Sequence, residues 1–459
     1  MLQKAMRWRM ICQILALFLF GNLVEGAKAN ELATVGSPQW VKKKMDEYPE
    51  LSWLLDEKVE HTQEGGASQK GESWSRALKG SHYPEFERTI ATLVNFHLLL
   101  DGSDEAFKRF VESQPSQEAL TRENFQKLHT FVQEVLAAQD EGSKAVEVDL
   151  ILGDMGKTPE ARRRAAEYSV DERDHDIFLS ICLKKCPEIF PTFSSISKKL
   201  QQALKEGTGL IHIGHAVHLE GDLKMLDELK NSNIVANNPK AFDLQILAYM
   251  MDVSGARAHE DNRGAKSFTN NIFLAINGMK EALSKLATQT PKEALSYYVD
   301  FRANLLGLDP SKQENRVLAR LGAMMRLFTP EDGQILEESY HLLADDQKKA
   351  VERTFNPFTA RKERTPTYIP AVFVNFLDSA MKQSMQRQEA INKCLIESVV
   401  PMAVFLQTYR EGKANQPYKS HMTLNFNKTA GQVRNDINVF KNHNFFIDKD
   451  WNVTLIVRP

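Results

Sequence analysis

Residues 150–159 read Leu-Ile-Leu-Gly-Asp-Met-Gly-Lys-Thr-Pro, an apolar run that ends in an acid, a glycine, a lysine and a proline. Aliphatic side chains followed by glycines predict a buried helix that ends where the carboxylate of Asp154 leaves the apolar packing. An ionised carboxylate in such a place needs a cation, because desolvating it without a partner costs several kcal/mol. The sequence offers two candidates, the ammonium of Lys157 and a bound metal ion.

Helices are expected on both sides of this stretch. Apolar residues at spacings of three and four predict buried helix faces over residues 86–98 and 125–136. His129 falls on the second face, where it is either a core histidine with a hydrogen-bond partner or a metal ligand. His175 lies between two aspartates at the entrance of a later helix, where acids also suit the helix dipole without any catalytic role.

Histidines cluster in residues 211–222, where His212, His215 and His218 recur at every third position. On a helix this spacing places neighbouring imidazoles about 60° apart, so that they form a polar stripe. Histidine is scarce in the chain, at 12 of 459 residues, so the clustering indicates more than surface decoration. Asp252 ends another apolar run, and the basic segment that follows it is suited to face an anion.

Composition bounds the class of protein. A chain of 459 residues with 42% hydrophobic and 26% charged residues is typical of a globular protein that is long enough for two or more cores. Lys and Arg number 58 against 60 Asp and Glu, so the net charge of -2 favours neither duplex nucleic acid nor an acidic membrane as a partner.

The first residues are typical of a secretory signal peptide. Basic residues precede the apolar run 11–20, and small residues follow at Ala27 and Ala29. We therefore expect a secreted or periplasmic protein with no transmembrane span after cleavage. An uncleaved membrane anchor is the alternative.

The order of these elements resembles the HD superfamily of metal-dependent phosphohydrolases. The His-Asp pair of that family lies in a stretch similar to Leu-Leu-His-Asp-Ile-Gly-Lys, which residues 152–157 match around Asp154, with Gly153 in place of the histidine. The resemblance covers residues 86–286. It implies a set of metal ligands drawn from His129, Asp154, His175, His212, His215 and Asp252.

The resemblance also implies an activity. A divalent ion, Mn, Fe, Zn or Mg, would activate water against a phosphomonoester or phosphodiester, so the partner would be a phosphate-containing small molecule or nucleotide. The candidate catalytic residues are then Asp154, Lys157 and His215, and the candidate substrate-binding residues are Arg257 and Arg263.

The glycine at position 153 leaves alternatives open. A later histidine fills the vacant place and the exported phosphohydrolase is active, or the metal is lost and the chain is a non-catalytic helical interaction protein with a vestigial HD-like core. A third possibility is another metal-dependent hydrolase or an oxygenase on the same scaffold, since ligand types do not fix a reaction.

The expected fold is mainly α, an HD-like helical domain with further C-terminal helices and a short β element at the C-terminus. Residues 422–426 and 453–457 are the predicted strands. The expected organisation is a signal peptide, an N-terminal helix and linker, the HD-like domain, a helical extension and a small β-containing tail, over residues 1–29, 30–85, 86–290, 291–415 and 416–459.

Overall fold

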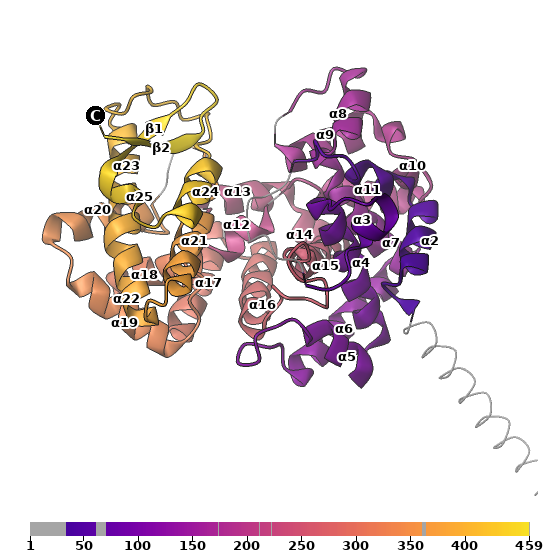
Figure 1. Ribbon diagram of the computed structural model, residues 1–459, viewed down its shortest axis with the longest axis horizontal. Helices are drawn as coiled ribbons and strands as arrows, with labels where there is room; N and C mark the ends of the chain where they lie inside the picture. The colour runs from indigo at the N-terminus through magenta and orange to yellow at the C-terminus, as the bar shows by residue number, and fades with distance from the viewer. Residues whose placement is uncertain are drawn as a thin grey trace, which may run out of the picture. The chain divides into compact units, whose positions relative to one another are not determined.

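The computed structural model describes residues 34–60, 70–172, 174–210, 212–221, 223–359 and 364–458. Over these ranges the chain is mainly α-helical, with a two-stranded antiparallel sheet near the C-terminus, as the sequence predicts (Figure 1). The predicted signal peptide lies outside the described residues, and so does most of the predicted linker. None of the helices within these ranges is both long and apolar enough to cross a membrane.

The chain forms two compact units. The first unit contains Met1–Glu60, Ala67–Gln201 and Met250–Asn270, and the second contains His61–Gly66, Gln202–Tyr249 and Asn271–Pro459. Residues 202–249, which carry the histidine cluster, belong to the second unit, whereas Asp154 and Asp252 belong to the first.

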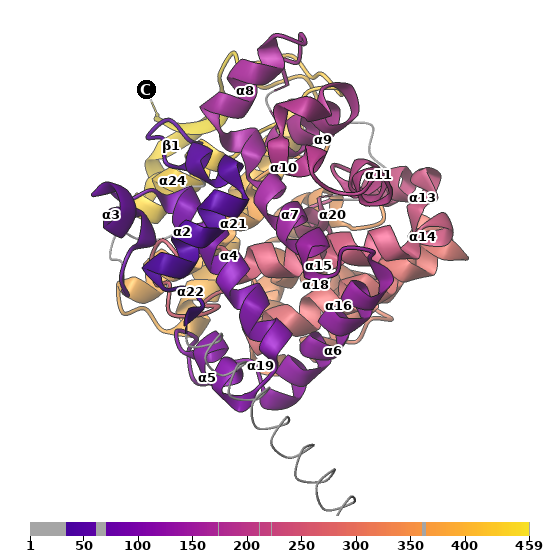
Figure 2. The same cartoon turned by 90° about the vertical axis from the view of Figure 1, so that its right-hand side faces the viewer.

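The first unit is built from short and medium helices (Figure 2). In chain order they are α2 (Pro38–Glu47), η1 (Pro49–Leu54), α3 (Trp74–Lys79), α4 (Pro84–Asp101), α5 (Asp104–Val111), α6 (Arg122–Ala138), α7 (Ser143–Gly153), η2 (Met155–Lys157), α8 (Pro159–Ala166), α9 (His175–Lys185), η3 (Pro187–Ile189) and α10 (Pro191–Ser194). Helices α11 (Lys198–Gly207) and α15 (Pro239–Gly255) run across the boundaries between the units.

Helix α4 is buried over most of its length and positions the site. Pro84 lies in its first turn, where the missing N–H would have no helical partner, and Gly102, with φ 69°, ends it in the left-handed conformation. Helices α5, α6 and α7 pack against it. This burial carries polar side chains at the start of α4 into the core beside the apolar ones.

The stretch around Asp154 is a buried helix end, as predicted. Residues 150–152 are buried at the end of α7, Asp154 follows as the C-cap, and η2 turns the chain into α8. Thr158 caps α8 by accepting a hydrogen bond from the backbone N–H of Ala161 at 3.3 Å. Gly156 faces the backbone of His175, and a Cβ there would lie 2.2 Å from that carbonyl oxygen, so the close approach of α9 to η2 requires glycine.

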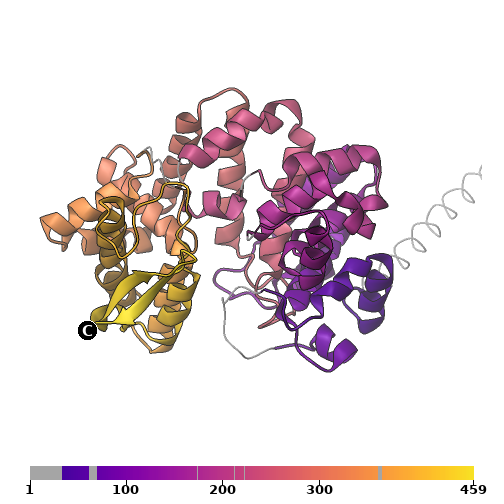
Figure 3. The same ribbon diagram turned by 90° about the horizontal axis from the view of Figure 1, so that it is seen from above.

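The second unit is also helical, and the hairpin at its C-terminus is drawn in yellow in Figure 3. Besides parts of α11 and α15 it contains α12 (Ile213–Val217), α13 (Leu223–Ser232), α14 (Ile234–Asn237), α16 (Asn270–Ser284), η4 (Lys285–Ala287), α17 (Pro291–Leu305), α18 (Gln313–Met324), α19 (Pro330–His341), α20 (Asp345–Phe355), α21 (Ile369–Lys382), α22 (Arg387–Cys394), η5 (Leu395–Val399), α23 (Val400–Arg410), α24 (Asn427–Asn435), α25 (Val439–Asn442), β1 (His443–Ile447) and β2 (Val453–Val457).

Only one of the two predicted strands is observed. Strand β2 is confirmed, but its partner is β1, with Phe445 opposite Leu455, and the strand predicted at residues 422–426 is wrong. In that segment Asn425 forms isolated bridges to Thr367 and Asn452, and α24 begins only two residues later. The segment is therefore too short to form a ladder before the chain turns into a helix.

Candidate functional site

Asp154 lies in a cluster of charged side chains, here called the Asp154 cluster, that joins α4 to the end of α7. The ammonium of Lys157 donates to Asp154 Oδ1 at 2.7 Å and to Glu85 Oε2 at 2.9 Å. Thr89 Oγ1 donates to Asp154 Oδ2 at 2.6 Å, and Arg88 Nη1 donates to Glu85 Oε1 at 3.0 Å. Both oxygens of Asp154 therefore have protein partners.

The cluster stays charged because its members hold one another in their ionised forms. Burial acts to raise the pKa of Asp154, but the charges of Lys157 and Arg88 outweigh it and keep that pKa at about 2. Burial acts to lower the pKa of Lys157, but the carboxylates of Asp154 and Glu85 raise it instead. Lys157, one of the two cations considered for Asp154 from the sequence, is thus the cation that contacts it.

Asp252 lies within electrostatic reach of this cluster. Crowding by protein atoms and the charge of Asp154 raise the pKa of Asp252, while Arg88 and Lys157 oppose that rise. Its surface nevertheless remains open to solvent, and its carboxylate forms neither a hydrogen bond nor an ion pair with the described residues. Solvent that reaches this carboxylate screens its charge from those of the cluster.

Gly153, which stands where the family has its histidine, is exposed and faces open space. A Cβ placed on it would meet no atom of another residue within 4 Å. The backbone there adopts helical geometry as the last residue of α7. The position of Gly153 therefore has room for a Cβ.

The structure does not bring His129 to Asp154. Its Nδ1 pairs with the carbonyl oxygen of Leu99 at 2.5 Å, in the last turn of α4, where carbonyls lack helical partners. Leu99 lies ten residues beyond Thr89, so about 15 Å separates the two along the helix axis. His129 thus has the contacts of a core histidine that ties α6 to the end of α4.

His175 reaches the cluster only through its backbone. That backbone packs against Gly156, whereas the imidazole Nε2 lies 3.5 Å from the carboxylate of Asp176. Asp174 caps α9 by accepting hydrogen bonds from the N–H groups of Asp176 and Ile177, each at 3.0 Å. Asp174 therefore caps α9, and Asp176 lies in its first turn, where an acid suits the helix dipole.

His212 and His215 lie close together in the second unit. His212 caps α12 by accepting from the N–H of His215 at 3.3 Å, and the two ring centroids are 4.0 Å apart. Nε2 of His215 lies 3.4 Å from Glu220, and burial together with His212 and His218 lowers the pKa of His215 well below its usual value. The planes of the two imidazole rings are tilted by 31° to each other.

The two arginines expected to bind phosphate already have acidic partners. Arg257 donates to Glu260 Oε2 at 3.1 and 2.8 Å, and Arg263 forms a bidentate pair with Asp261 at 2.9 Å for each contact. A phosphate at either guanidinium would compete with a carboxylate of the same segment.

Within the part of the chain that the structure describes, no three His, Cys, Asp or Glu side chains are arranged to hold a metal ion. The charge of Asp154 raises the pKa of Asp252, His129 contacts Leu99 near the far end of α4, and the carboxylate oxygens of Asp154 accept hydrogen bonds from Lys157 and Thr89.

Glu85, Arg88 and Thr89 complete the cluster and were not predicted from the sequence. They lie at the start of α4, where polar residues ordinarily remain exposed, yet all three are buried. One signal was present: Glu85 and Thr89 are four residues apart and therefore lie on one face of the helix with Arg88, in a segment otherwise rich in apolar residues.

Comparison with known proteins yields a family. A search of curated proteins found no match, and a search of solved structures found none either. A family model matches most of the chain, including the Asp154 cluster and the histidine cluster. The chain belongs to the family of unknown function DUF6829, whose model matches residues 41–419.

Proposed function

We propose that this chain is a non-catalytic helical interaction protein, in which Lys157 supplies the positive charge that a metal ion supplies in HD-type phosphohydrolases. The observation that carries this proposal is the double contact of Lys157 with Asp154 and Glu85. Lysine and both acids are buried, so the ammonium neutralises carboxylates that would otherwise be costly to bury.

A metal ion would have to compete with this arrangement. Binding at Asp154 would place a second cation beside the ammonium of Lys157, which already contacts Oδ1, while Thr89 donates to Oδ2. A lysine displaced from Asp154 would keep its contact with Glu85 but lose one of its two counter-charges, and breaking a buried ion pair typically costs about 3–5 kcal/mol. The ion pair therefore favours Lys157 over a metal ion as the partner of Asp154.

The second candidate function is the metal-dependent phosphohydrolase. Two observations favour it: the space beside Gly153 is open, and the exposed carboxylate of Asp252 lies within electrostatic reach of Asp154. Under this alternative a divalent ion would use these acids, and the substrate would be a phosphomonoester or phosphodiester.

Metal content and hydrolysis distinguish the two functions. The protein would be purified without chelators, its Mn, Fe, Zn and Mg content measured, and its hydrolysis of p-nitrophenyl phosphate and bis-p-nitrophenyl phosphate compared with that of Asp154→Asn. The interaction protein is expected to contain no stoichiometric metal and to hydrolyse neither ester faster than the variant. Stoichiometric metal, together with hydrolysis that disappears in Asp154→Asn, would instead establish the phosphohydrolase.

A further inference from the structure

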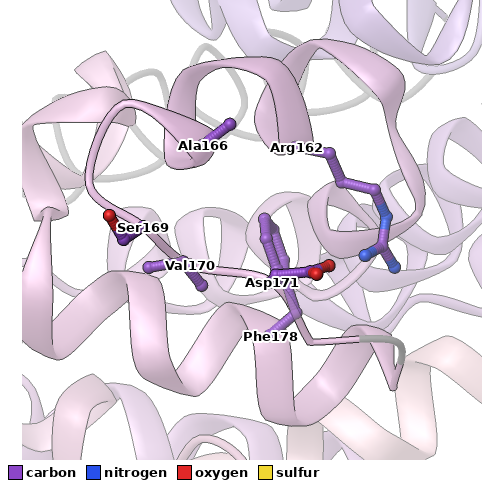
Figure 4. A pocket seen from close by; sticks show the side chains of 6 residues that line it. All are labelled: Arg162, Ala166, Ser169, Val170, Asp171 and Phe178. Carbon is purple, nitrogen blue, oxygen red and sulfur yellow. The ribbon is translucent and has the colours of Figure 1, made fainter.

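Arg302, in α17, is a buried arginine that forms no ion pair with any described residue. Its exposed fraction is 0%, its Nη2 donates to the carbonyl oxygen of Leu327 at 2.7 Å, and its guanidinium carbon lies 4.6 Å from the centre of the Phe328 ring. Its Nε and Nη1 are buried and have no hydrogen-bond partner among the described residues. Arg162 differs, because it is partly exposed and lines a pocket of about 400 Å³ (Figure 4), where solvent screens its charge. The charge of Arg302 is therefore neither paired with an acid nor screened by solvent.

His218 lies within electrostatic reach of this charge. It is the C-cap of α12, and its ring forms a hydrogen bond with the backbone of Ala323. The residue is partly exposed, but its Nδ1 is buried and has no hydrogen-bond partner in the part of the chain that the structure describes. Burial and the charges of Arg326 and Arg302 lower the pKa of His218 well below its usual value. The imidazole is therefore neutral at neutral pH.

The acids on the elements around His218 already have partners. Glu220 accepts a hydrogen bond from the N–H of Ile369 at 2.8 Å, and its other oxygen lies 3.4 Å from Nε2 of His215. Two acids on α17 and α19 are paired with arginines, Asp300 with Arg316 and Asp332 with Arg387. His212, on the side of α12, opposes protonation of His218 as the arginines do. None of these three acids is free to pair with a protonated His218.

Residues 213–221 are held against α17 and α18 by a few hydrogen bonds. Tyr298 of α17 donates to the carbonyl oxygen of Val217 at 2.7 Å. Arg320 of α18 donates to the carbonyl oxygen of Leu219 at 2.7 Å and to those of the two following residues. Leu219 has φ 51°, in the left-handed region, which is unfavourable for a residue other than glycine. The strained backbone persists only while these contacts hold, so this segment opens more readily than its surroundings.

We propose that residues 213–221 form an acid-sensitive switch, in which protonation of His218 at Nδ1 releases the segment from α17 and α18. In the open segment the imidazole is solvated and takes up a proton near its usual pKa of about 6.5. In the closed segment the proton would add a positive charge near Arg302 and Arg326. The closed form is therefore favoured above about pH 6.5 and loses this advantage as the pH falls below it, by about tenfold for each pH unit. The proposal does not depend on the function assigned to the Asp154 cluster.

Hydrogen exchange of the full chain tests this proposal, measured by mass spectrometry at pH 7.5 and pH 5.5 and corrected for the intrinsic pH dependence of amide exchange. The opening equilibrium constant of residues 213–221 is expected to rise at least about tenfold between these pH values. That of α23, in the same unit, is expected to change less than about twofold, because the opening is local. Equal opening of residues 213–221 at the two pH values, or an equal rise in α23, would overturn the proposal.

His218→Gln assigns the effect to this residue, because glutamine keeps an amide that can hydrogen-bond to Ala323 and does not titrate. The ratio of the opening constants at pH 5.5 and pH 7.5 is expected to be about tenfold smaller in this variant than in wild type. His341→Gln removes an exposed histidine of α19 and is the matched control, with the wild-type ratio expected. A wild-type ratio in His218→Gln would also overturn the proposal, and if that variant does not fold, the comparison of residues 213–221 with α23 in wild type decides.

Discussion

Lys157 is the residue on which the Asp154 cluster depends. Its ammonium contacts two buried carboxylates, and no other cation is hydrogen-bonded to Asp154 among the described residues. Lys157→Met keeps most of the volume of the side chain and removes the charge. We expect it to lower the free energy of unfolding by about 3–5 kcal/mol, the usual cost of leaving a buried charge without its partner.

Urea denaturation at pH 7 measures this loss. Lys108→Met is the matched control, because Lys108 is exposed and its nearest acid, Glu105, lies 3.9 Å away at the surface. The control is expected to change stability by less than about 1 kcal/mol. A loss in Lys157→Met as small as that in the control would mean that the ion pair contributes little.

Glu147 gives a second prediction at the scale of a residue. It is buried and accepts hydrogen bonds from Tyr48 at 2.8 Å and from Lys44, and its other oxygen lies 2.9 Å from Nε2 of His97. Burial acts to raise the pKa of Glu147, but His97 and Lys44 hold it at about 2. Because this pKa is lower in the folded than in the unfolded state, the stabilisation is present above about pH 4.5 and is lost as the pH falls toward 2.

We therefore expect the free energy of unfolding of Glu147→Gln to depend less on pH at acid pH than that of wild type. Wild type should lose more stability than the variant between pH 5 and pH 3, by up to about 2 kcal/mol, as judged by urea denaturation at each pH. Glu105→Gln, at an exposed position, should follow wild type. Parallel profiles for wild type and Glu147→Gln would remove Glu147 from the account of acid sensitivity.

At the scale of the element, the C-terminal hairpin shows how a two-stranded sheet completes its hydrogen bonds. Each strand has an open edge, and a side-chain amide pairs with the backbone on each. Gln432 accepts from Leu455 N–H at 2.8 Å and donates to Leu455 carbonyl at 2.7 Å. Asn415 makes the same two contacts with Ile447, at 3.0 and 2.8 Å. These amides occupy positions that another strand would otherwise take.

Gln432→Ala tests this role. It removes both contacts to Leu455 at once, and we expect a loss of about 1–3 kcal/mol together with faster hydrogen exchange at the Leu455 amide. Asn435→Ala, at an exposed position of the same helix, is the control. Unchanged exchange at Leu455 would show that solvent replaces the amide without cost.

At the scale of the whole molecule, the periodicity of apolar residues predicted helices and a strand that form within a few residues. It did not predict contacts between residues that are far apart in the sequence. The buried end of α7, the buried faces of α4 and α6 and strand β2 follow from patterns within a few residues, and each was confirmed. The convergence of Glu85 on Lys157 joins residues 72 positions apart, and no periodic pattern records such a contact. The same limit explains the strand predicted at residues 422–426, whose pattern did not reveal that α24 starts at once.

The site shows this limit most clearly. A local reading of residues 150–159 offered both Lys157 and a metal as the cation for Asp154, and only the fold brings Glu85 and Thr89 close enough to complete the lysine arrangement. His129 was expected on an inward face and lies there, but at the far end of α4 from Thr89. The metal, the phosphohydrolase activity and the exported location remain predictions.

The thermal response to divalent metal tests the central claim most directly, namely that Lys157 takes the place of a metal at Asp154. Wild type, Lys157→Met and Asp154→Asn would be melted with and without an excess of Mn, Fe, Zn or Mg. A ligand that binds only the folded state raises the Tm, so no rise is expected for wild type with any of the four ions. A rise in the wild-type Tm that is abolished in Asp154→Asn would contradict it, because the metal would then bind at Asp154 in spite of Lys157.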